Sequence, residues 1–343
     1  MATNIDVKAL LQTLSARLPR IEGLTRASVP SVGVEISSRR VTVVRARKER
    51  RGIRCLGHGS VELSEGAVQS SLLKCVVIQR AEVLTALKRA VAEAGVKGGR
   101  AALTLPDIAG RVTLLSVAGL PRSHAQAEEL IRFRLKRTLP FKPEDVAVSF
   151  QRLTPTAEGD QVITVMAMRS VIEQHEGLLA EAGLRPGLVS FSTLELANLL
   201  RAELTALGAA DTSGPGDSAL LNCEPEYSTL ALFRRGEIMF FRCKIHMVGE
   251  EADVAGRLRS LRRELTTSLS YYAEKLGGRL PVPALVRNLD PLAESLPDLA
   301  GDVGLAPFHA VELSDRVALP GGPAPFHLAR LAPALGITGG RMR

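Results

Sequence analysis

Histidine and cysteine supply most metal ligands and many nucleophiles, and this 343-residue chain has six of the first and four of the second. They are His58, His124, His175, His246, His309, His327, Cys55, Cys75, Cys223 and Cys243. Their spacings do not assemble a zinc motif, and the chain lacks both the Gly-x-Ser-x-Gly elbow of hydrolases and the Walker phosphate loop. We therefore predict no metal centre and no catalytic site built on these residues.

Ordinary structural roles are expected for these side chains instead. His124 and His175 fall in helical patterns, and we expect both at the surface. The cysteines lie about twenty residues or more apart, which is not typical of a disulfide framework. Reduced, buried thiols of a cytoplasmic protein are the expectation.

The elements that would position a site are best marked between residues 100 and 153. Short β-prone runs at 102–105 and 111–117 precede a Gly-Leu-Pro break. Ser123 can cap a helix that starts at His124 and reaches about residue 138, where Leu-Pro ends it because proline has no amide proton. Residues 144–153 then alternate as a half-buried strand does. This block therefore reads as strand, strand, helix, strand.

The remaining chain shows two similar series of strands, each followed by a helix. The first has strands at 32–36, 41–46 and 52–58 and helices at 81–94, 171–182 and 191–207, with a turn at 183–187. The second has strands at 219–221, 228–233, 237–244 and 284–290, a long apolar-striped helix from about 254, and a helix at 326–335. Such a repeat predicts two α/β lobes, as the length also does.

Charge and composition limit the partners. The net charge of +8 favours an acidic partner or an anionic membrane surface, and the 3% of aromatic residues disfavours nucleic acid, which needs stacking platforms. No stretch of about 18 apolar residues occurs, and the start lacks a signal-peptide pattern. Residues 4–18 have helical spacing, in Val7, Leu11, Leu14 and Leu18.

The chain resembles the type IV pilus assembly protein PilM family in the 102–153 block, which reads LTLP…LLSVAGLP…AEELIRFRLKRTLPFKPEDVAVSFQRL. The resemblance implies an α/β, actin-like or ribonuclease H-like, two-lobe fold. It also implies an inserted α+β subdomain of the PilM/FtsA 1C type and a reduced or missing 2B subdomain. The expected domains are an N-terminal helix and linker (1–30), a first lobe (31–97 and 165–207), the inserted subdomain (98–164), a linker (208–217) and a second lobe with a C-terminal helix (218–343).

Actin-like relatives bind nucleotide phosphates with small residues in three loops, and the resemblance implies that all three are degenerate here. Asp-x-Gly in the first loop corresponds to Glu35 and Ser37, followed by Ser38. Bulkier side chains crowd phosphate, and a serine is strained if the backbone needs a positive φ.

The other two loops depart in the same way. The second has Asn222 and Glu224 where Asp-x-Gly is expected, and Asn288 stands in a third loop that has no glycine. The resemblance therefore indicates a pseudo-ATPase that is not an enzyme and has no cofactor or metal.

The family resemblance further suggests a cytoplasmic scaffold at the inner face of the cytoplasmic membrane. It would bind the tail of a PilN-type inner-membrane protein in a groove between the first lobe and the inserted subdomain, and contact other pilus platform or motor proteins. Arg132, Arg134, Lys136 and Arg137 are the candidate partner-binding residues, with Arg111 and Arg122 as weaker ones. Homo-oligomers are compatible with this reading, and nucleic acid is not expected as a partner.

Two alternatives stay open. One is an active actin-like protein that holds ATP and Mg²⁺ through Glu35, Ser37, Ser38 and Asn222. The other is a platform component like GspL of type II secretion, which shares the fold but carries a transmembrane helix of its own.

Overall fold

The computed structural model describes residues 29–49, 52–69, 76–136, 142–156, 159–210, 215–246, 253–289, 296–311, 313, 317–318 and 325–339. Within these ranges the chain forms two compact units. The first comprises 29–48, 55–192 and 337–339, and the second comprises 49–54 and 193–336. The helix expected at 4–18 lies outside the described residues.

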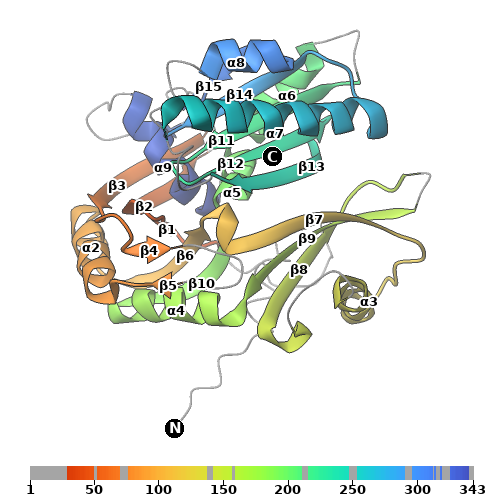
Figure 1. Ribbon diagram of the computed structural model, residues 1–343. Helices are drawn as coiled ribbons and strands as arrows, with labels where there is room; N and C mark the ends of the chain where they lie inside the picture. Colours follow the sequence, from red (N-terminus) through yellow and green to blue (C-terminus); the bar gives the residue numbers. More distant parts are fainter. Residues whose placement is uncertain are drawn as a thin grey trace. The chain divides into compact units, whose positions relative to one another are not determined.

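The first unit is built on a sheet in which the strand order is β10-β6-β1-β2-β3 (Figure 1). Its strands are β1 (Val32–Ile36), β2 (Arg40–Glu49), β3 (Gly52–Glu62), β6 (Gly99–Leu105) and β10 (Leu184–Phe191). β1 pairs antiparallel with β2 and parallel with β6, and β6 is also parallel to β10. The predicted meander of three strands is therefore present. β4 (Val68–Gln69) and β5 (Val76–Val77), which follow β3 in the chain, form a separate two-stranded sheet.

Two helices of this unit match their predictions closely, α2 (Arg80–Glu93) and α4 (Arg169–Glu181). Glycines on β3 let α2 approach the strand backbone. A Cβ on Gly57 would lie 2.4 Å from the Ala94 carbonyl oxygen, and one on Gly59 would lie 2.4 Å from that of Ala90. No side chain fits at either position, so the close packing of helix on strand depends on glycine.

A three-stranded antiparallel sheet, in the order β7-β9-β8, forms the inserted subdomain. It consists of β7 (Gly110–Val117), β8 (Val146–Arg152) and β9 (Asp160–Met168), with α3 (His124–Lys136) and the short 3-10 turns η1 (Asp107–Ala109) and η2 (Pro143–Asp145). Ala127, Ile131 and Leu135 of α3 are buried against this sheet. The first run of the predicted unit, 102–105, belongs instead to β6 of the larger sheet, because it pairs in parallel with β1.

The segment after α4 also differs from its prediction. Only Gly183, with a φ of +80°, makes the turn expected at 183–187, and β10 begins at the next residue. The helix expected at 191–207 is two helices, α5 (Ser192–Leu199) and α6 (Arg201–Ala210), which follow the end of β10 at Phe191. The sequence predicted a turn here because Pro186 and Gly187 are typical turn residues. In the structure both lie inside β10, where a bulge between Pro186 and Leu188 accommodates them.

The second unit has a five-stranded sheet in the order β13-β12-β11-β14-β15. The strands are β11 (Asp217–Cys223), β12 (Tyr227–Arg234), β13 (Glu237–Ile245), β14 (Val282–Asn288) and β15 (Leu305–Ala310), and the helices are α7 (Val254–Lys275), α8 (Leu296–Val303) and α9 (Pro325–Ile337). α7 and α8 lie across one face of the sheet (Figure 1). β16 (Val317–Ala318) pairs in parallel with the start of β3. Residues 246–253 alone separate β13 from α7.

Candidate functional site

The first loop that could face a phosphate is the turn between β1 and β2, and its polar groups bond to one another. The Ser37 hydroxyl donates to the Arg40 carbonyl oxygen at 3.2 Å, and it accepts from the amides of Arg39 at 3.4 Å and Arg40 at 3.2 Å. The Ser37 amide donates to the same Arg40 oxygen at 2.9 Å. Backbone amides that could cradle an anion are thus engaged by a side chain of their own loop.

This turn also lacks the left-handed backbone of a glycine-rich phosphate loop. Among the described non-glycine residues only Arg235 has a positive φ. Ser38 is buried, Arg40 is buried, and the Arg39 guanidinium pairs with Glu65 at 3.2 Å. The two arginines are therefore not a free anion-binding pair.

Glu35 is buried at the core of the first unit. Its Oε1 lies 3.0 Å from the Ser192 hydroxyl, which also lies 3.2 Å from the Leu105 carbonyl oxygen. The carboxylate thus connects β1 to the residue that opens α5. A carboxylate in this position stabilises the joint between strand and helix whether or not a ligand is present.

The second and third loops come together in the second unit around an arginine that the sequence reading did not single out. Arg287 is fully buried, and its Nη1 lies 2.5 Å from Glu224 Oε1 and 2.9 Å from Asn222 Oδ1. Its Nε donates to the Ala329 carbonyl oxygen at 2.6 Å, and Asn222 Nδ2 donates to the Thr193 hydroxyl at 2.8 Å. We call Asn222, Glu224 and Arg287 the arginine cluster.

Strand pairing explains why the arginine cluster forms. β11 and β14 are parallel neighbours, and their register sets Asn222 opposite Arg287 and Cys223 opposite Asn288. Burial, with the nearby Glu224 charge, raises the pKa of Cys223 to about 12, so this thiol stays protonated. One sequence signal could have revealed the cluster. Arg287 is a lone arginine in an otherwise apolar strand, and a charge buried there needs a buried partner.

A different kind of site lies wholly within the first unit, between the inserted subdomain and the large sheet. It is an apolar pocket lined by Leu105, Ala147, Val148, Ser149, Val165, Met166, Ala167, Ile172, Val189 and Phe191. The Phe191 ring packs against Gly110, where a Cβ would lie 2.0 Å from a ring carbon. Two edge strands border the pocket, β8 of the subdomain sheet and β10 of the large sheet.

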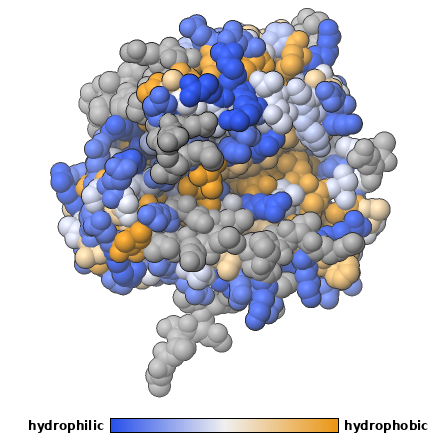
Figure 2. All heavy atoms as spheres, viewed as in Figure 1, coloured by the Kyte–Doolittle hydropathy of each residue, from blue (hydrophilic) through white to orange (hydrophobic). Residues whose placement is uncertain are grey.

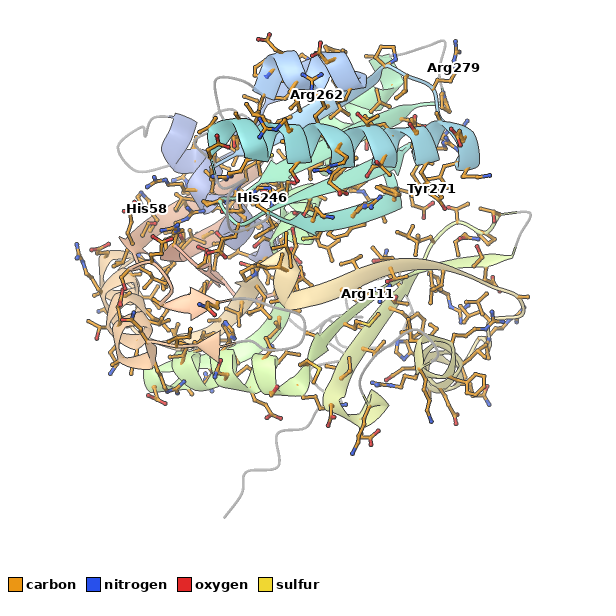
Figure 3. The ribbon with its side chains drawn as sticks, in the orientation of Figure 1. His58, Arg111, His246, Arg262, Tyr271 and Arg279 are labelled. Carbon is orange, nitrogen blue, oxygen red and sulfur yellow. The ribbon has the colours of Figure 1, made fainter. Side chains whose placement is uncertain are left out.

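The four candidate partner-binding residues do not share one environment. The Arg132 guanidinium pairs with Glu128 at 2.9 Å and donates to the Val146 carbonyl oxygen at 3.3 Å, so it holds α3 on β8. Arg134 and Lys136 are exposed, and Arg137 lies outside the described residues. Arg122 is also exposed, as is Arg111 on β7 (Figure 3).

Histidines and acidic residues form no metal site in the part of the chain that the structure describes. The prediction that His175 lies at the surface is wrong. It is fully buried, its Nδ1 lies 2.8 Å from the Val171 carbonyl oxygen, and burial lowers its pKa. His124 is exposed and stacks on Phe150 with ring centroids 4.7 Å apart.

A model of the type IV pilus assembly protein PilM family matches residues 33–250, which is more than half of the chain. The chain belongs to this family. A search of curated proteins finds no match. None of the described helices is long and apolar enough to cross a membrane.

The fold of this PilM-family chain matches that of a solved structure. It is similar to the "PilM-PilN type IV pilus biogenesis complex", with a TM-score of 0.72 and 19% identity over 92% of this chain and 98% of that chain. The cytoplasmic domain of EpsL, an inner-membrane component of the type II secretion system of Vibrio cholerae, is 12% identical over 82% of this chain and 90% of that one, with a TM-score of 0.48. A Bacteroides thetaiotaomicron protein with an actin-like ATPase fold is 11% identical over 90% and 99%, with a TM-score of 0.46.

ATP and Mg²⁺ are the alternative ligands of the three loops that contain Ser37, Asn222 and Asn288. The contacts of these loops do not suit a nucleotide. Ser37 engages the amides of the first loop, and Arg287 engages the polar side chains of the second. Asn288, in the third loop, is half-buried at the end of β14, and no glycine follows it there. The first two loops are therefore closed by side chains of their own unit.

Proposed function

We propose that this chain is a scaffold of a type IV pilus assembly platform that binds the cytoplasmic tail of a PilN-type inner-membrane protein and does not hydrolyse ATP. The apolar pocket of the first unit is the observation that carries the proposal. Family membership and the likeness to a PilM-PilN complex support the choice of partner. Binding to the tail would hold the chain at the inner face of the cytoplasmic membrane.

The chemistry of the pocket suits an extended apolar peptide. Its lining is almost wholly aliphatic and aromatic, with Ser149 as the polar exception. The edges of β8 and β10 carry backbone amides and carbonyl groups that can bond to an added strand, while apolar side chains of the peptide pack on the lining between the two edges. Backbone pairing would give affinity, and the pocket would select the side chains.

The absence of hydrolysis rests on the loops rather than on the pocket. Phosphate groups near Glu224 would meet a carboxylate that already bonds to Arg287, and a nucleotide would have to break this contact. A buried charge that loses its partner costs several kcal/mol. An active ATPase would lose this free energy each time it bound a nucleotide.

Calorimetric titration with a synthetic peptide of the PilN-type tail tests the proposal. Ala147→Phe places a bulky ring on the apolar lining and is expected to weaken binding at least about tenfold, since the peptide then loses its contacts with that lining. Ala125→Phe is the matched control, because Ala125 is exposed on α3. A tail peptide that does not bind the wild-type chain contradicts the proposed function, and equal binding by the two variants contradicts the pocket.

Titration with ATP and Mg²⁺ tests the second half of the proposal. We expect no binding heat for the wild-type chain. Micromolar binding that Glu35→Ala abolishes would support the ATPase alternative instead.

A further inference from the structure

The outer face of α3 carries an aromatic side chain that the fold does not use. Phe133 is 66% exposed, more than any other large hydrophobic side chain among the described residues. Ala127, Ile131 and Leu135 bury the opposite face of the same helix. Helical geometry places Phe133 on the side turned away from this stripe. At the position of α3, Figure 2 shows a small apolar patch among hydrophilic side chains.

Basic residues flank Phe133 in the last turn of α3. Arg134 and Lys136 are exposed and form no ion pair with the described residues, whereas Arg132 is held by Glu128. The sequence from Leu130 to Lys142 contains five basic residues and no acidic one. The last turn of α3 is therefore a cationic surface that carries an exposed apolar side chain, and the exposed acidic Glu129 lies one turn before Phe133.

We propose that the face formed by Phe133, Arg134 and Lys136, here called the α3 face, contacts an anionic lipid bilayer. Basic side chains attract acidic headgroups with about 1 kcal/mol each, and an aromatic ring between them can enter the boundary between headgroups and acyl chains. Charge complementarity selects this occupant, because the chain carries a net charge of +8 and the α3 face combines two exposed basic side chains with an exposed aromatic ring.

The α3 face is turned away from the subdomain sheet, whereas the apolar pocket lies against that sheet, where Val148 and Met166 of its lining also pack beneath α3. Val146, Val148 and Phe150 of β8 pack beneath α3. Ala147 and Ser149, which alternate with them, line the pocket. A peptide in the pocket therefore leaves the α3 face uncovered, and the inference does not rest on the proposed function.

One exposed ring and two free basic residues give only weak, reversible binding. Such a contact becomes useful when a second link keeps the chain near the bilayer, since tethering raises the effective concentration of the face. The α3 face would then set which side of the subdomain points to the membrane.

Co-sedimentation of the full chain with vesicles tests this inference. We expect binding to vesicles that contain phosphatidylglycerol, no binding to phosphatidylcholine alone, and release at high salt. Arg134→Glu with Lys136→Glu is expected to lower the partition coefficient about tenfold or more. Phe133→Ala is expected to lower it severalfold at constant charge.

Matched controls come from α7, where Arg262 and Tyr271 are labelled in Figure 3. Arg259 and Arg263 are exposed one turn apart, and Tyr271 is 48% exposed. Arg259→Glu with Arg263→Glu, and Tyr271→Ala, should leave vesicle binding unchanged. An equal loss in the α7 variants would show attraction by net charge alone and overturn the inference.

Two further results would also overturn it. One is that the wild-type chain does not bind anionic vesicles, which would leave an acidic protein as the better occupant of the α3 face. The other is that Phe133→Ala binds the vesicles as tightly as the wild-type chain does, which would show that the ring does not enter the bilayer. Saturating tail peptide should not displace the vesicles.

Discussion

Nη1 of Arg287 lies 2.5 Å from Oε1 of Glu224, and these side chains are 0% and 5% exposed. The pair joins the end of β14 to the residue after β11, with Asn222 as a third member. The buried ion pair thus links two neighbouring strands of the second unit.

Breaking the arginine cluster should destabilise the chain strongly. Arg287→Ala leaves the Glu224 carboxylate buried without its partner, which typically costs about 3–5 kcal/mol. Chemical denaturation monitored by circular dichroism measures this loss. Arg259→Ala, on the exposed side of α7, is the control and should change stability by less than about 0.5 kcal/mol.

A double replacement separates pairing from packing. Glu224→Leu with Arg287→Leu removes both charges, so its cost should be well below the sum of the two single variants. Additive costs would show that the two side chains do not interact.

Asp217 is the centre of a second polar cluster in the second unit, and Tyr272→Phe should lower the stability of the chain by removing one of its hydrogen bonds. The Arg234 guanidinium contacts both Asp217 oxygens at 2.8 Å, and the Tyr272 hydroxyl donates to Oδ2 at 2.7 Å. Burial and the hydrogen bond to Asp217 raise the pKa of Tyr272. We expect a loss of about 1.5–3 kcal/mol, because the acceptor is charged. Tyr271→Phe is the neighbouring control, since that ring is half exposed.

Glu176 makes stability fall as pH rises. Burial, with the nearby Glu173 charge, raises its pKa from 4.5 to about 6. Between these values the folded chain holds a proton that the unfolded chain has released, so its contribution is lost as pH rises through the window. Glu176→Gln should therefore gain up to about 2 kcal/mol at pH 7 and nothing at pH 4. Thermal melts at the two pH values test the difference, and a gain at pH 4 alone would contradict the assignment.

The glycines of β3 are expected to tolerate no side chain. Gly59→Ala places a Cβ 2.4 Å from the Ala90 carbonyl oxygen, so α2 must move, at a cost of about 1–3 kcal/mol. Gly301→Ala is the matched control, because no atom lies within 4 Å of that Cβ and the helix α8 favours alanine. Equal melting temperatures for the two variants would show that the β3 backbone is not in close contact with α2.

Local patterns predicted much of this fold because its strands and helices are regular. The two apolar runs around a short polar turn, which became β1 and β2, and the stripe on α7 place these elements within a few residues of their observed ends. What failed depends on contacts between distant segments. Residues 102–105 read as part of the inserted subdomain, but their partners are β1 and β10, about 70 or more residues away.

The candidate site shows the same division. Glu35, Ser37, Asn222 and Glu224 stood out in the sequence because their loops lack small residues. Arg287 did not, since only the parallel register of β11 and β14 brings it to Asn222. The resemblance placed a groove between the first lobe and the inserted subdomain, but the residues that line the apolar pocket could not be named from the sequence, because they come from five separate elements.

Titration of the full chain with the PilN-type tail peptide, with and without ATP and Mg²⁺, tests the scaffold proposal most directly. A pocket confined to the first unit and loops closed by their own side chains predict the same Kd in both conditions. Binding that requires ATP, or that changes tenfold when it is added, would contradict a scaffold that works without nucleotide.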